Sequence, residues 1–284
     1  MENKPLLQRF SVNLRLHRNN KRIDKRMRKV FIYVLWGFVL LCMLVVAIIF
    51  TAIAKGKIGY VPPVEELENP NLKFATQIIS DDGKLLGTWS LSKENRVYVG
   101  YEDLSPHLVH ALVATEDVRF EDHSGIDARA FMRAVIKRGI FMQKHAGGGS
   151  TITQQLAKNE LFTQEKQLTR KAAEVFAAFA LERTYTKQQI LEMYVNTIYF
   201  GSGYYGIHDA AQGYFGCEPS QLADWQAVML AGLPNAPSAY SPDKSPQLAL
   251  ERTRAVLRRM ADHGTITLDR AAELAQQAEN EYGR

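Results

Sequence analysis

The chain has 284 residues, of which 46% are apolar, and a formal net charge of +5. Most of the excess positive charge precedes residue 30, so the basic balance does not indicate nucleic-acid binding. Of the two cysteines, Cys42 lies in a long apolar run and Cys217 lies far downstream, so no disulfide is expected. Without the apolar run and a linker, about 185 residues remain, which is enough for one sizeable domain.

The N-terminal part divides into a basic tail and an apolar run. Residues 1–29 contain many lysines and arginines, opposed only by Glu2 and Asp24, whereas residues 30–54 carry no charge. At about 1.5 Å per residue this run can cross a hydrocarbon core of roughly 30 Å, which predicts a transmembrane helix. The alternative is a buried helix of a soluble protein. The basic flank predicts a cytoplasmic N-terminus, with the rest of the chain outside the membrane.

Residues 55–103 are predicted to form a stalk and a small β-hairpin. The stalk is rich in proline and acids, and residues 74–80 and 85–91 then flank an Asp82-Gly83 turn of the kind that closes hairpins. Residues 96–99 are a candidate third strand. No other strand is expected downstream. Because a lone hairpin is marginal in water, this one is expected to need a partner.

From Ser105 onward the apolar spacing is helical, and residues 104–265 are predicted to form one mainly α domain. A first helix is expected to open at Ser105-Pro106. Residues 128–145 mix apolar and basic side chains, which indicates either a helix on a membrane surface or an ordinary helix with a core face. Further helices are expected at 166–184, at 187–200, from Ser220 to Leu233 before a proline-rich loop, around Val256–Met260 as far as Gly264, and in an exposed C-terminal extension, 266–284.

The stretch from Gly147 to Asn159 combines three glycines with a helix start. The glycines free the backbone, and Thr151 and Gln154 have the spacing of a capping box. Lys158 follows two turns into the helix. Helix N-terminal N–H groups beside a cation favour a bound anion, of which phosphate is the usual one. The alternative is an ordinary capped helix after a flexible loop.

Two acids and a group of cations carry the expected chemistry. Glu116 ends an apolar helix, and Glu174 shares a helix face with Arg170 and Lys171. A separated pair of carboxylates is the usual equipment for making or breaking a glycosidic bond. The cations instead suit a leaving group that departs as a polyanion, such as pyrophosphate. Taken singly, the acids are consistent with solvated carboxylates, and the charged cluster with salt bridges on a helix surface.

Four segments stand in a defined order. They are Glu116-Asp117-x-x-Phe120-x-x-His123-x-Gly125-x-Asp127, Gly148-Gly149-Ser150-Thr151-Ile152-Thr153-Gln154-Gln155 with Lys158-Asn159, Arg170-Lys171-x-x-Glu174, and Lys187-x-x-Ile190-Leu191-Glu192-x-Tyr194-x-Asn196 followed by Tyr199-x-Gly201. In this order and spacing they resemble the motifs of the peptidoglycan glycosyltransferases, glycosyltransferase family 51. The resemblance covers roughly residues 100–265.

This resemblance implies a lysozyme-like helical domain that polymerises lipid II. Glu116 would be the general base that deprotonates the 4-hydroxyl of the acceptor, and that oxygen would attack the anomeric carbon of a chain on polyprenyl pyrophosphate, with inversion. Glu174 would assist at the leaving group, either directly or through a divalent cation, Mg²⁺ or Mn²⁺. No other cofactor and no bound metal is expected. The residues implied in substrate binding are Asp117, Phe120 and His123 around Glu116, Ser150, Thr151 and Gln154 in the donor site, and Lys158, Lys166, Arg170 and Lys171 at the pyrophosphate.

The implied location is the bacterial cytoplasmic membrane, with the catalytic domain on its periplasmic side. Residues 128–145 would correspond to the part of the family that dips into the bilayer. Lipid II, the lipid-linked glycan and membrane lipids are the expected partners, together with transpeptidases and other cell-wall synthesis proteins. Nucleic acid is not an expected partner.

Three alternatives accompany this interpretation. A lytic enzyme of the lysozyme type would share the fold and the acid, but it would not need Lys158, Arg170 and Lys171 about a pyrophosphate. A membrane-anchored scaffold would allow loss of the motif acids, yet both are present. The segment 79–83 resembles the entry of two-domain penicillin-binding proteins. The chain is therefore also expected to be a fragment, or a shortened relative, of such a bifunctional enzyme.

Overall fold

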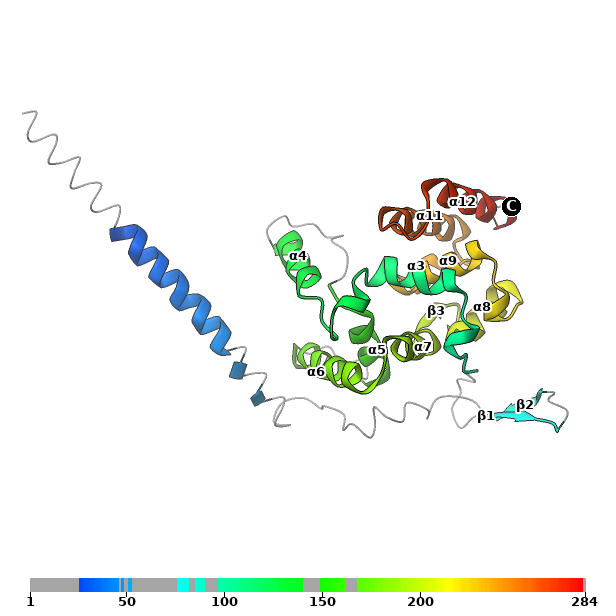
Figure 1. Cartoon of the computed structure of the whole chain (residues 1–284), viewed down its shortest axis with the longest axis horizontal. Helices are drawn as coiled ribbons and strands as arrows, with labels where there is room; N and C mark the ends of the chain where they lie inside the picture. Colours follow the sequence, from blue (N-terminus) through cyan, green and yellow to red (C-terminus); the bar gives the residue numbers. More distant parts are fainter. Residues whose placement is uncertain are drawn as a thin grey trace, which may run out of the picture. The chain divides into compact units, whose positions relative to one another are not determined.

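The structure, a computed structural model, describes residues 26–45, 47–48, 51–52, 76–81, 85–89, 97–139, 149–161 and 168–282. The chain divides into two compact units, Met1–Ile58 and Gly59–Arg284. In the first unit, Arg26–Val45 forms a helix, blue in Figure 1, that is long and apolar enough to cross a membrane. None of this helix is buried, unlike the core helix of a soluble domain. It begins four residues before the predicted apolar run, and the tail before it lies outside the described residues.

Two antiparallel strands, β1 (Thr76–Ile79) and β2 (Leu85–Trp89), confirm the predicted hairpin. The pairing is irregular between Ile78 and Ile79. The Asp82-Gly83 turn itself lies outside the described residues.

The candidate third strand is wrong in its described residues, which form no strand. Their backbone is paired with side chains instead. Asn196 accepts from the Val99 N–H at 2.9 Å and donates to the Val99 carbonyl at 2.8 Å. Asn196 therefore takes the place of a neighbouring strand at Val99, because it satisfies both backbone groups that a ladder would otherwise satisfy. Next to it, Glu192 accepts from the Tyr101 N–H at 2.9 Å and from the Tyr98 hydroxyl.

The rest of the described chain is mainly helical, as predicted. The elements are η2 (Tyr101–Asp103), α3 (Pro106–Glu116), η3 (Phe120–Asp122), α4 (Ala128–Gly139), α5 (Ile152–Leu161), α6 (Leu168–Thr184), α7 (Lys187–Thr197), β3 (Tyr199–Gly201), β4 (Tyr204–Tyr205), α8 (Ile207–Phe215), η4 (Pro219–Gln221), α9 (Asp224–Gly232), η5 (Leu233–Asn235), α10 (Pro237–Tyr240), α11 (Pro246–Asp262) and α12 (Leu268–Tyr282). The start of α3, with Ser105 as N-cap and proline in its first turn, confirms the prediction.

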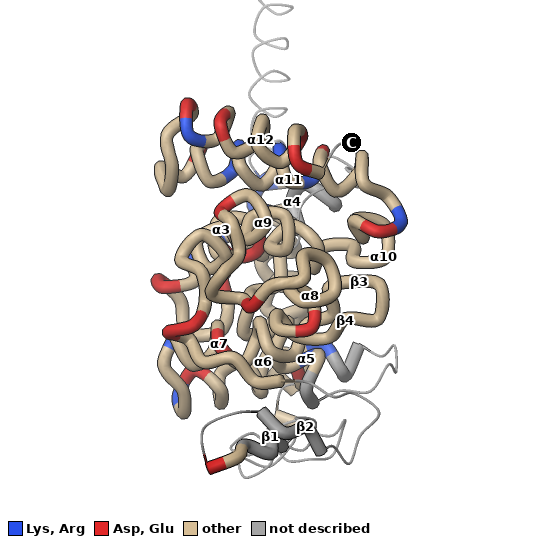
Figure 2. The backbone as a smooth tube through the Cα atoms, turned by 90° about the vertical axis from the view of Figure 1, so that its right-hand side faces the viewer, with Lys and Arg blue, Asp and Glu red and all other residues tan. Residues whose placement is uncertain are grey.

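The helices pack in two adjoining groups. α3, α9 and α11 contact one another, with α12 against α9 and α11, whereas α5 contacts α6 and α7. Figure 1 shows both groups, and Figure 2 shows α11 and α12 together at one end of the domain. One buried apolar cluster contains residues of both groups, among them the fully buried Phe120 and Tyr194. A single core therefore fixes the two groups against each other.

The prediction of an exposed C-terminal helix is wrong in one respect. α12 buries Ala271, Leu274 and Ala278, which are 8%, 0% and 1% exposed, and it packs on α9 and α11. Two alanines and one leucine make a narrow apolar stripe among many polar residues, so the sequence pattern resembles a solvated helix.

Two short strands correct the expectation that no strand follows the hairpin. α7 ends at Thr197 rather than at residue 200, and β3 and β4 then pair through a tight turn. The turn depends on glycine, because Gly201 and Gly203 have φ angles of +98° and +92°.

Gly201→Ala is expected to lower the free energy of unfolding by about 3–5 kcal/mol, from backbone strain and overpacking together. An added Cβ would lie 2.7 Å from the Pro237 carbonyl oxygen and 2.9 Å from the Tyr214 hydroxyl. Gly203→Ala is the matched control, since its φ is also positive but nothing lies within 4 Å of the added Cβ. It should cost only about 1–2 kcal/mol. Urea unfolding followed by circular dichroism measures both losses, and equal losses would contradict the clash.

The helix start predicted at Ser220 is also wrong. Ser220 lies within η4, and α9 begins at Asp224. The Ala223 N–H before α9 donates to the Gln226 side chain at 2.8 Å, which closes this helix start without a hydroxyl cap. The predicted loop 234–246 contains part of η5 and the short helix α10.

Candidate active site

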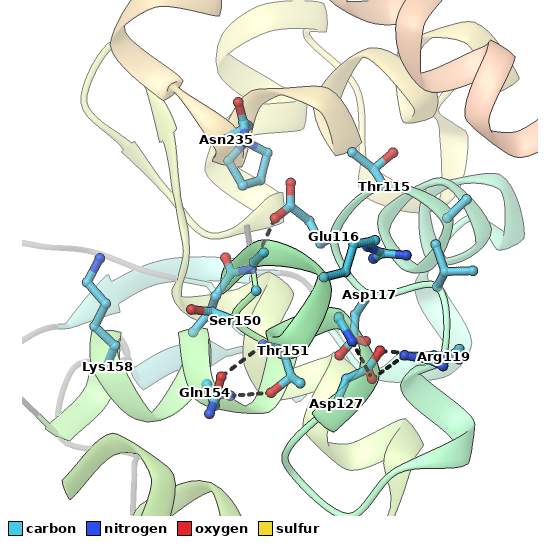
Figure 3. A pocket seen from close by; sticks show the side chains of 18 of the residues that line it. Thr115, Glu116, Asp117, Arg119, Asp127, Ser150, Thr151, Gln154, Lys158 and Asn235 are labelled. Carbon is cyan, nitrogen blue, oxygen red and sulfur yellow. Dashed lines mark hydrogen bonds and ion pairs between the residues drawn. The ribbon is translucent and has the colours of Figure 1, made fainter. Parts of the chain in front are cut away.

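A cleft of about 800 Å³ is lined by residues of α3, α4, α5, α6, η5 and α11 (Figure 3). Eight residues predicted from the sequence line it: Glu116, Asp117, Ser150, Thr151, Gln154, Lys158, Lys171 and Glu174. The cleft thus brings together both predicted acids and two of the predicted cations. Lys166 lies outside the described residues, and only the backbone of Arg170 is described, in α6.

The first turn of α5 is capped as predicted. The Thr151 N–H donates to Gln154 Oε1 at 3.1 Å, and the Gln154 N–H donates to Thr151 Oγ1 at 3.1 Å, which confirms the capping box. The Thr151 hydroxyl also donates to the Gly125 carbonyl at 2.7 Å, and the Ile152 N–H donates to Asp117 at 3.0 Å. Three N–H groups at this helix start, those of Thr151, Ile152 and Gln154, are therefore already paired within the protein. These three are not available for the anion that the sequence suggested.

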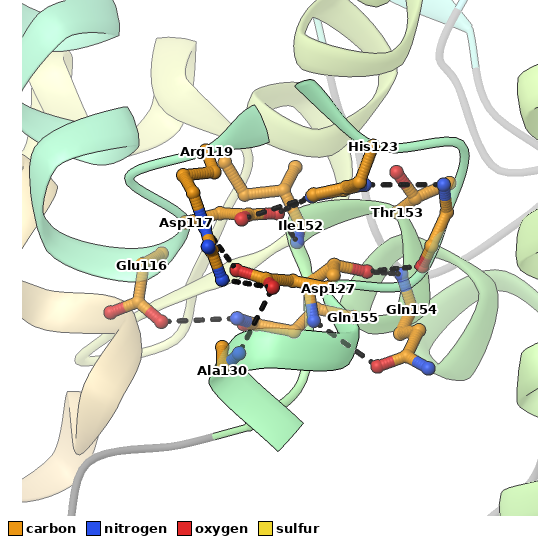
Figure 4. Close-up of polar contacts among 12 residues, drawn as sticks. Glu116, Asp117, Arg119, His123, Asp127, Ala130, Ile152, Thr153, Gln154 and Gln155 are labelled. Atoms are coloured by element: carbon orange, nitrogen blue, oxygen red, sulfur yellow. Dashed lines mark hydrogen bonds and ion pairs between the residues drawn. The ribbon is translucent and has the colours of Figure 1, made fainter. Parts of the chain in front are cut away.

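Asp117 is buried beside the cleft and connects several segments (Figure 4). His123 Nε2 lies 2.9 and 3.0 Å from the two Asp117 carboxylate oxygens. The His123 ring meets Phe120 edge to face, with 6.1 Å between ring centroids, and Phe120 is fully buried. Phe120 and His123 are not among the lining residues, so they support Asp117 from behind the cleft.

Lys187 supports the same loop from α7. Its ammonium donates to the His123 carbonyl at 2.7 Å, pairs with Glu182 at 2.8 Å and lies 4.3 Å from the centre of the Phe120 ring. Glu182 in turn accepts from the Thr153 hydroxyl in α5 at 2.6 Å. This network fastens the loop after α3 to α5, α6 and α7.

Glu116, at the end of α3, is held through Gln155. The Gln155 amide donates from Nε2 to Glu116 Oε2 at 3.0 Å, and the Tyr194 hydroxyl donates to Gln155 Oε1 at 3.1 Å. Burial, together with the charges of Glu116 and Asp117, raises the pKa of Tyr194, so its phenol keeps the proton that it donates. The tyrosine thereby fixes the amide with its NH₂ group toward Glu116. Only 10% of the Glu116 side chain is exposed.

Glu174, the second predicted acid, projects from α6. Its side chain is 2% exposed and Oε2 lies 2.9 Å from the Lys171 ammonium, which confirms that the two share a helix face. Lys171 also donates to the Ser150 hydroxyl at 2.9 Å. Glu174 therefore holds one cation of the cleft in place beside the start of α5.

Arg119 and Asp127 form an ion pair at the edge of the cleft. Arg119 Nε donates to Asp127 Oδ2 at 3.0 Å, and a guanidinium N–H donates to Oδ1. Asp127 also accepts from the Ala130 N–H at 2.9 Å, so it caps the start of α4. Burial acts to raise the pKa of Asp127, but the bonds from Arg119 and the backbone outweigh it and lower the pKa below its ordinary value.

Asp127→Asn is expected to lower the melting temperature by about 2–4 °C at pH 7 and by less at pH 3.5. The folded-state pKa is depressed, so the carboxylate contributes stability above its unfolded-state pKa of about 3.9, and this is lost as the pH falls through the folded-state value. Asp122→Asn, an exposed neighbour, is the control and should change little at either pH. Melting curves at several pH values measure the difference. A loss that does not depend on pH would contradict the ion-pair explanation.

Several lining residues could not be predicted from the sequence. Arg119, Arg133, Arg259 and His263 line the cleft, and Arg259 donates to the Thr115 carbonyl at 2.8 Å. Arg259 on α11 and His263 at its end lie more than 130 residues beyond Glu116 in the sequence. The amphipathic pattern of α11 assigns such side chains to solvent, so no local signal indicates their place.

Within the described part of the chain, no three His, Cys, Asp or Glu side chains are placed to hold a metal ion. Glu174, which was predicted to act directly or through a divalent cation, is paired with Lys171. The cleft residues alone do not form a site for Mg²⁺ or Mn²⁺, so such an ion would need further ligands from a bound pyrophosphate.

Residues 82–261 match the family described as transglycosylase, and the chain belongs to this family. The matched region begins in the β-hairpin and ends near the end of α11.

Several relatives of the chain are penicillin-binding proteins. Penicillin-binding protein 1A of Aquifex aeolicus is 42% identical over 229 residues, which cover 78% of this chain and 31% of that protein. Penicillin-binding protein 1A of Escherichia coli is 41% identical over 206 residues, covering 72% and 24%. The crystal structure of penicillin-binding protein 1A from Haemophilus influenzae aligns with a TM-score of 0.40 at 25% identity, covering 72% of this chain and 20% of that one. The chain thus spans about a quarter to a third of the length of its curated relatives.

Proposed function

We propose that this chain is a membrane-anchored peptidoglycan glycosyltransferase that polymerises lipid II into β-1,4-linked glycan strands. The observation that carries the proposal is one cleft that contains a nearly buried carboxylate, Glu116, together with Lys158 and Lys171. A base for a hydroxyl and cations for a pyrophosphate are what glycosyl transfer from a lipid pyrophosphate requires. A lytic enzyme would need the acid without these cations.

Glu116 is proposed to act as the general base. It would take the proton from the 4-hydroxyl of the acceptor lipid II while that oxygen forms a bond to the anomeric carbon of the donor. The bond from this carbon to the pyrophosphate oxygen breaks on the opposite face, so the configuration inverts. The electron pair leaves with the polyprenyl pyrophosphate, and the proton stays on Glu116 until it is released to solvent. The contact from Gln155 supports this role because it orients the carboxylate.

The leaving pyrophosphate is proposed to be stabilised by Lys158 and Lys171, with Lys166 and Arg170 added on the strength of the motif. Glu174 supports this indirectly, because its contact with Lys171 holds that ammonium near Ser150. Cations placed in advance stabilise charge as it develops on the leaving group, without reorganisation during the reaction. Ser150, Thr151 and Gln154 would line the donor side of the cleft.

The location is proposed as the outer side of the cytoplasmic membrane, with the N-terminus in the cytoplasm. Arg26–Val45 is long enough to span, and the basic residues before it favour the cytoplasmic side. α4 adds a second contact, since Phe131 and Met132 are 53% and 54% exposed among arginines. Such a contact suits substrates whose lipid tails stay in the bilayer. Transpeptidases and other cell-wall synthesis proteins are the proposed protein partners.

The test uses the detergent-solubilised protein with labelled lipid II and, separately, with purified cell-wall sacculi. The expected result is a ladder of glycan products on a gel, with release of polyprenyl pyrophosphate and no solubilisation of sacculi. Solubilised sacculi without ladders would support the lytic alternative. Folded protein that does neither would support an accessory role. Heat-denatured protein is the blank for both assays.

A further inference from the structure

Glu116 and Arg252 are two charged groups that face each other inside the protein. Glu116 Oε1 lies 3.9 Å from Arg252 Nη2, and the side chains are 10% and 11% exposed. Both atoms are buried, and neither has a hydrogen-bond partner among the described residues. Burial of an unpaired charge costs free energy of folding. Each of these two buried charges is therefore stabilised by the opposite charge close to it.

Arg252 is fixed in this position from the side away from Glu116. Its Nε donates to the Gly232 carbonyl at 3.0 Å, and its guanidinium lies 5.5 Å from the centre of the Tyr240 ring. A Cβ at residue 232 would lie 3.0 Å from Arg252 Cγ, so the stem passes close to a residue that has no side chain. These contacts leave Nη2 as the end of the guanidinium that faces the carboxylate.

The carboxylate of Glu116 is thus held from two sides that differ in charge. Gln155, a neutral donor oriented by Tyr194, bonds to Oε2, whereas a cation faces Oε1. The neutral amide fixes the direction of the carboxylate but carries no charge. A cation within about 4–6 Å favours the ionised form, which is the form that a base requires.

We propose that Arg252 is a positioning residue for Glu116, which keeps that carboxylate ionised and aimed when the acceptor hydroxyl arrives. This inference rests on the proposed function. Burial acts to lower the pKa of Arg252, and Glu116 opposes that effect, which agrees with mutual stabilisation of the two charges. Arg252 itself would not touch the reacting atoms.

Other charged or titratable groups lie around the cleft and beside the pair. They are Asp117 and Arg119 after α3, Tyr194 on α7, Lys158 on α5, Lys171 and Glu174 on α6, Arg133 on α4, Arg259 and His263 on α11 and after it, and Tyr240 beside Arg252. Lys171 already pairs with Glu174, and Arg119 with Asp127. Among the ion pairs of the described residues, Arg252 is the cation placed on Glu116.

The test is the pH dependence of glycan synthesis by Arg252→Gln in the full chain. The acidic limb of the rate profile is expected to move up by about one pH unit, because a carboxylate without a neighbouring cation is harder to ionise. The rate should fall about tenfold on that limb and return to within about twofold of wild type at high pH. Arg252→Lys, which restores a positive charge, should return the limb toward its wild-type position. An equal loss at every pH would overturn the inference in favour of a purely structural role.

Arg254→Gln is the matched control. Arg254 lies on the same helix and also pairs with a carboxylate, Glu279 at 3.0 Å, but both side chains are well exposed and outside the cleft. Arg254→Gln should leave the acidic limb of the rate profile at its wild-type position. A limb that moves equally in both variants would also overturn the inference, since the effect would then reflect net charge alone.

A second measurement needs no Arg252 variant, so it decides the matter if that variant fails to fold. Melting temperatures of the wild type and Glu116→Gln are compared at pH 8. The glutamine variant leaves Arg252 buried without its carboxylate, so it should melt at a lower temperature than the wild type. Equal melting temperatures would overturn the inference that the two charges stabilise each other. If the wild type makes no glycan, the proposed function is overturned. The melting comparison can still be made, because it does not depend on glycan synthesis.

Discussion

Glu116→Gln is expected to reduce glycan synthesis at least about 10³-fold while the protein remains folded. General base catalysis contributes about 10²–10⁴-fold, and an attacking hydroxyl without a base is a weak nucleophile. Glutamine has nearly the same shape as glutamate, and its carbonyl can still accept the bond from Gln155, now made to Glu116 Oε2 at 3.0 Å. The loss would therefore report the missing base rather than a distorted cleft. Glycan ladders from labelled lipid II measure it.

Glu121→Gln is the control for this variant. Glu121 is exposed in η3, five residues beyond Glu116, and is not among the residues that line the cleft. The same chemical change there should leave the ladders unchanged. Equal ladders from Glu116→Gln and wild type would place the base on another acid, and Glu174→Gln would be measured next.

Asp117→Ala is expected to lower the free energy of unfolding by about 3–5 kcal/mol. The Asp117 carboxylate is buried and lies 2.9 Å from His123 Nε2 and 3.0 Å from the Ile152 nitrogen. Its removal leaves a backbone N–H at the start of α5 and an imidazole without their partner, inside the protein. Urea unfolding measures the loss of stability. Glycan synthesis should also fall, because the loop that directly follows Glu116 loses this contact with α5.

The control for this change is Asp122→Ala, an exposed aspartate of the same loop. It should alter the unfolding free energy by no more than about 0.5 kcal/mol. If the two alanine variants were equally stable, Asp117 would not be the tie between the loop and α5.

The sequence predicts those parts of the site that depend on local spacing. The capping box of Thr151 and Gln154 and the contact of Lys171 with Glu174 each join residues three apart, so a helix alone is enough to specify them. The start of α3 at a serine and a proline follows from the same kind of local rule.

Features that depend on distant packing could not be predicted in this way. Arg252 meets Glu116 only because α11 packs on α3 and α9, and its spacing on α11 gives no sign of this. The segment around Val99 has strand-like residues, but its partner is the Asn196 side chain on α7 rather than a strand. The buried stripe of α12 is mostly alanine, which carries a weak hydrophobic signal.

A molecule that occupies only the half of the cleft around α5 should still disturb the half around α3. Asp117 follows Glu116 directly in the chain, and its carboxylate accepts from the Ile152 N–H in the first turn of α5. Lys187 binds the same loop, because its ammonium donates to the His123 carbonyl. A ligand that shifts the start of α5 should therefore also shift Asp117 and, with it, the backbone next to Glu116. A small inhibitor could therefore abolish the activity of this protein without contacting Glu116.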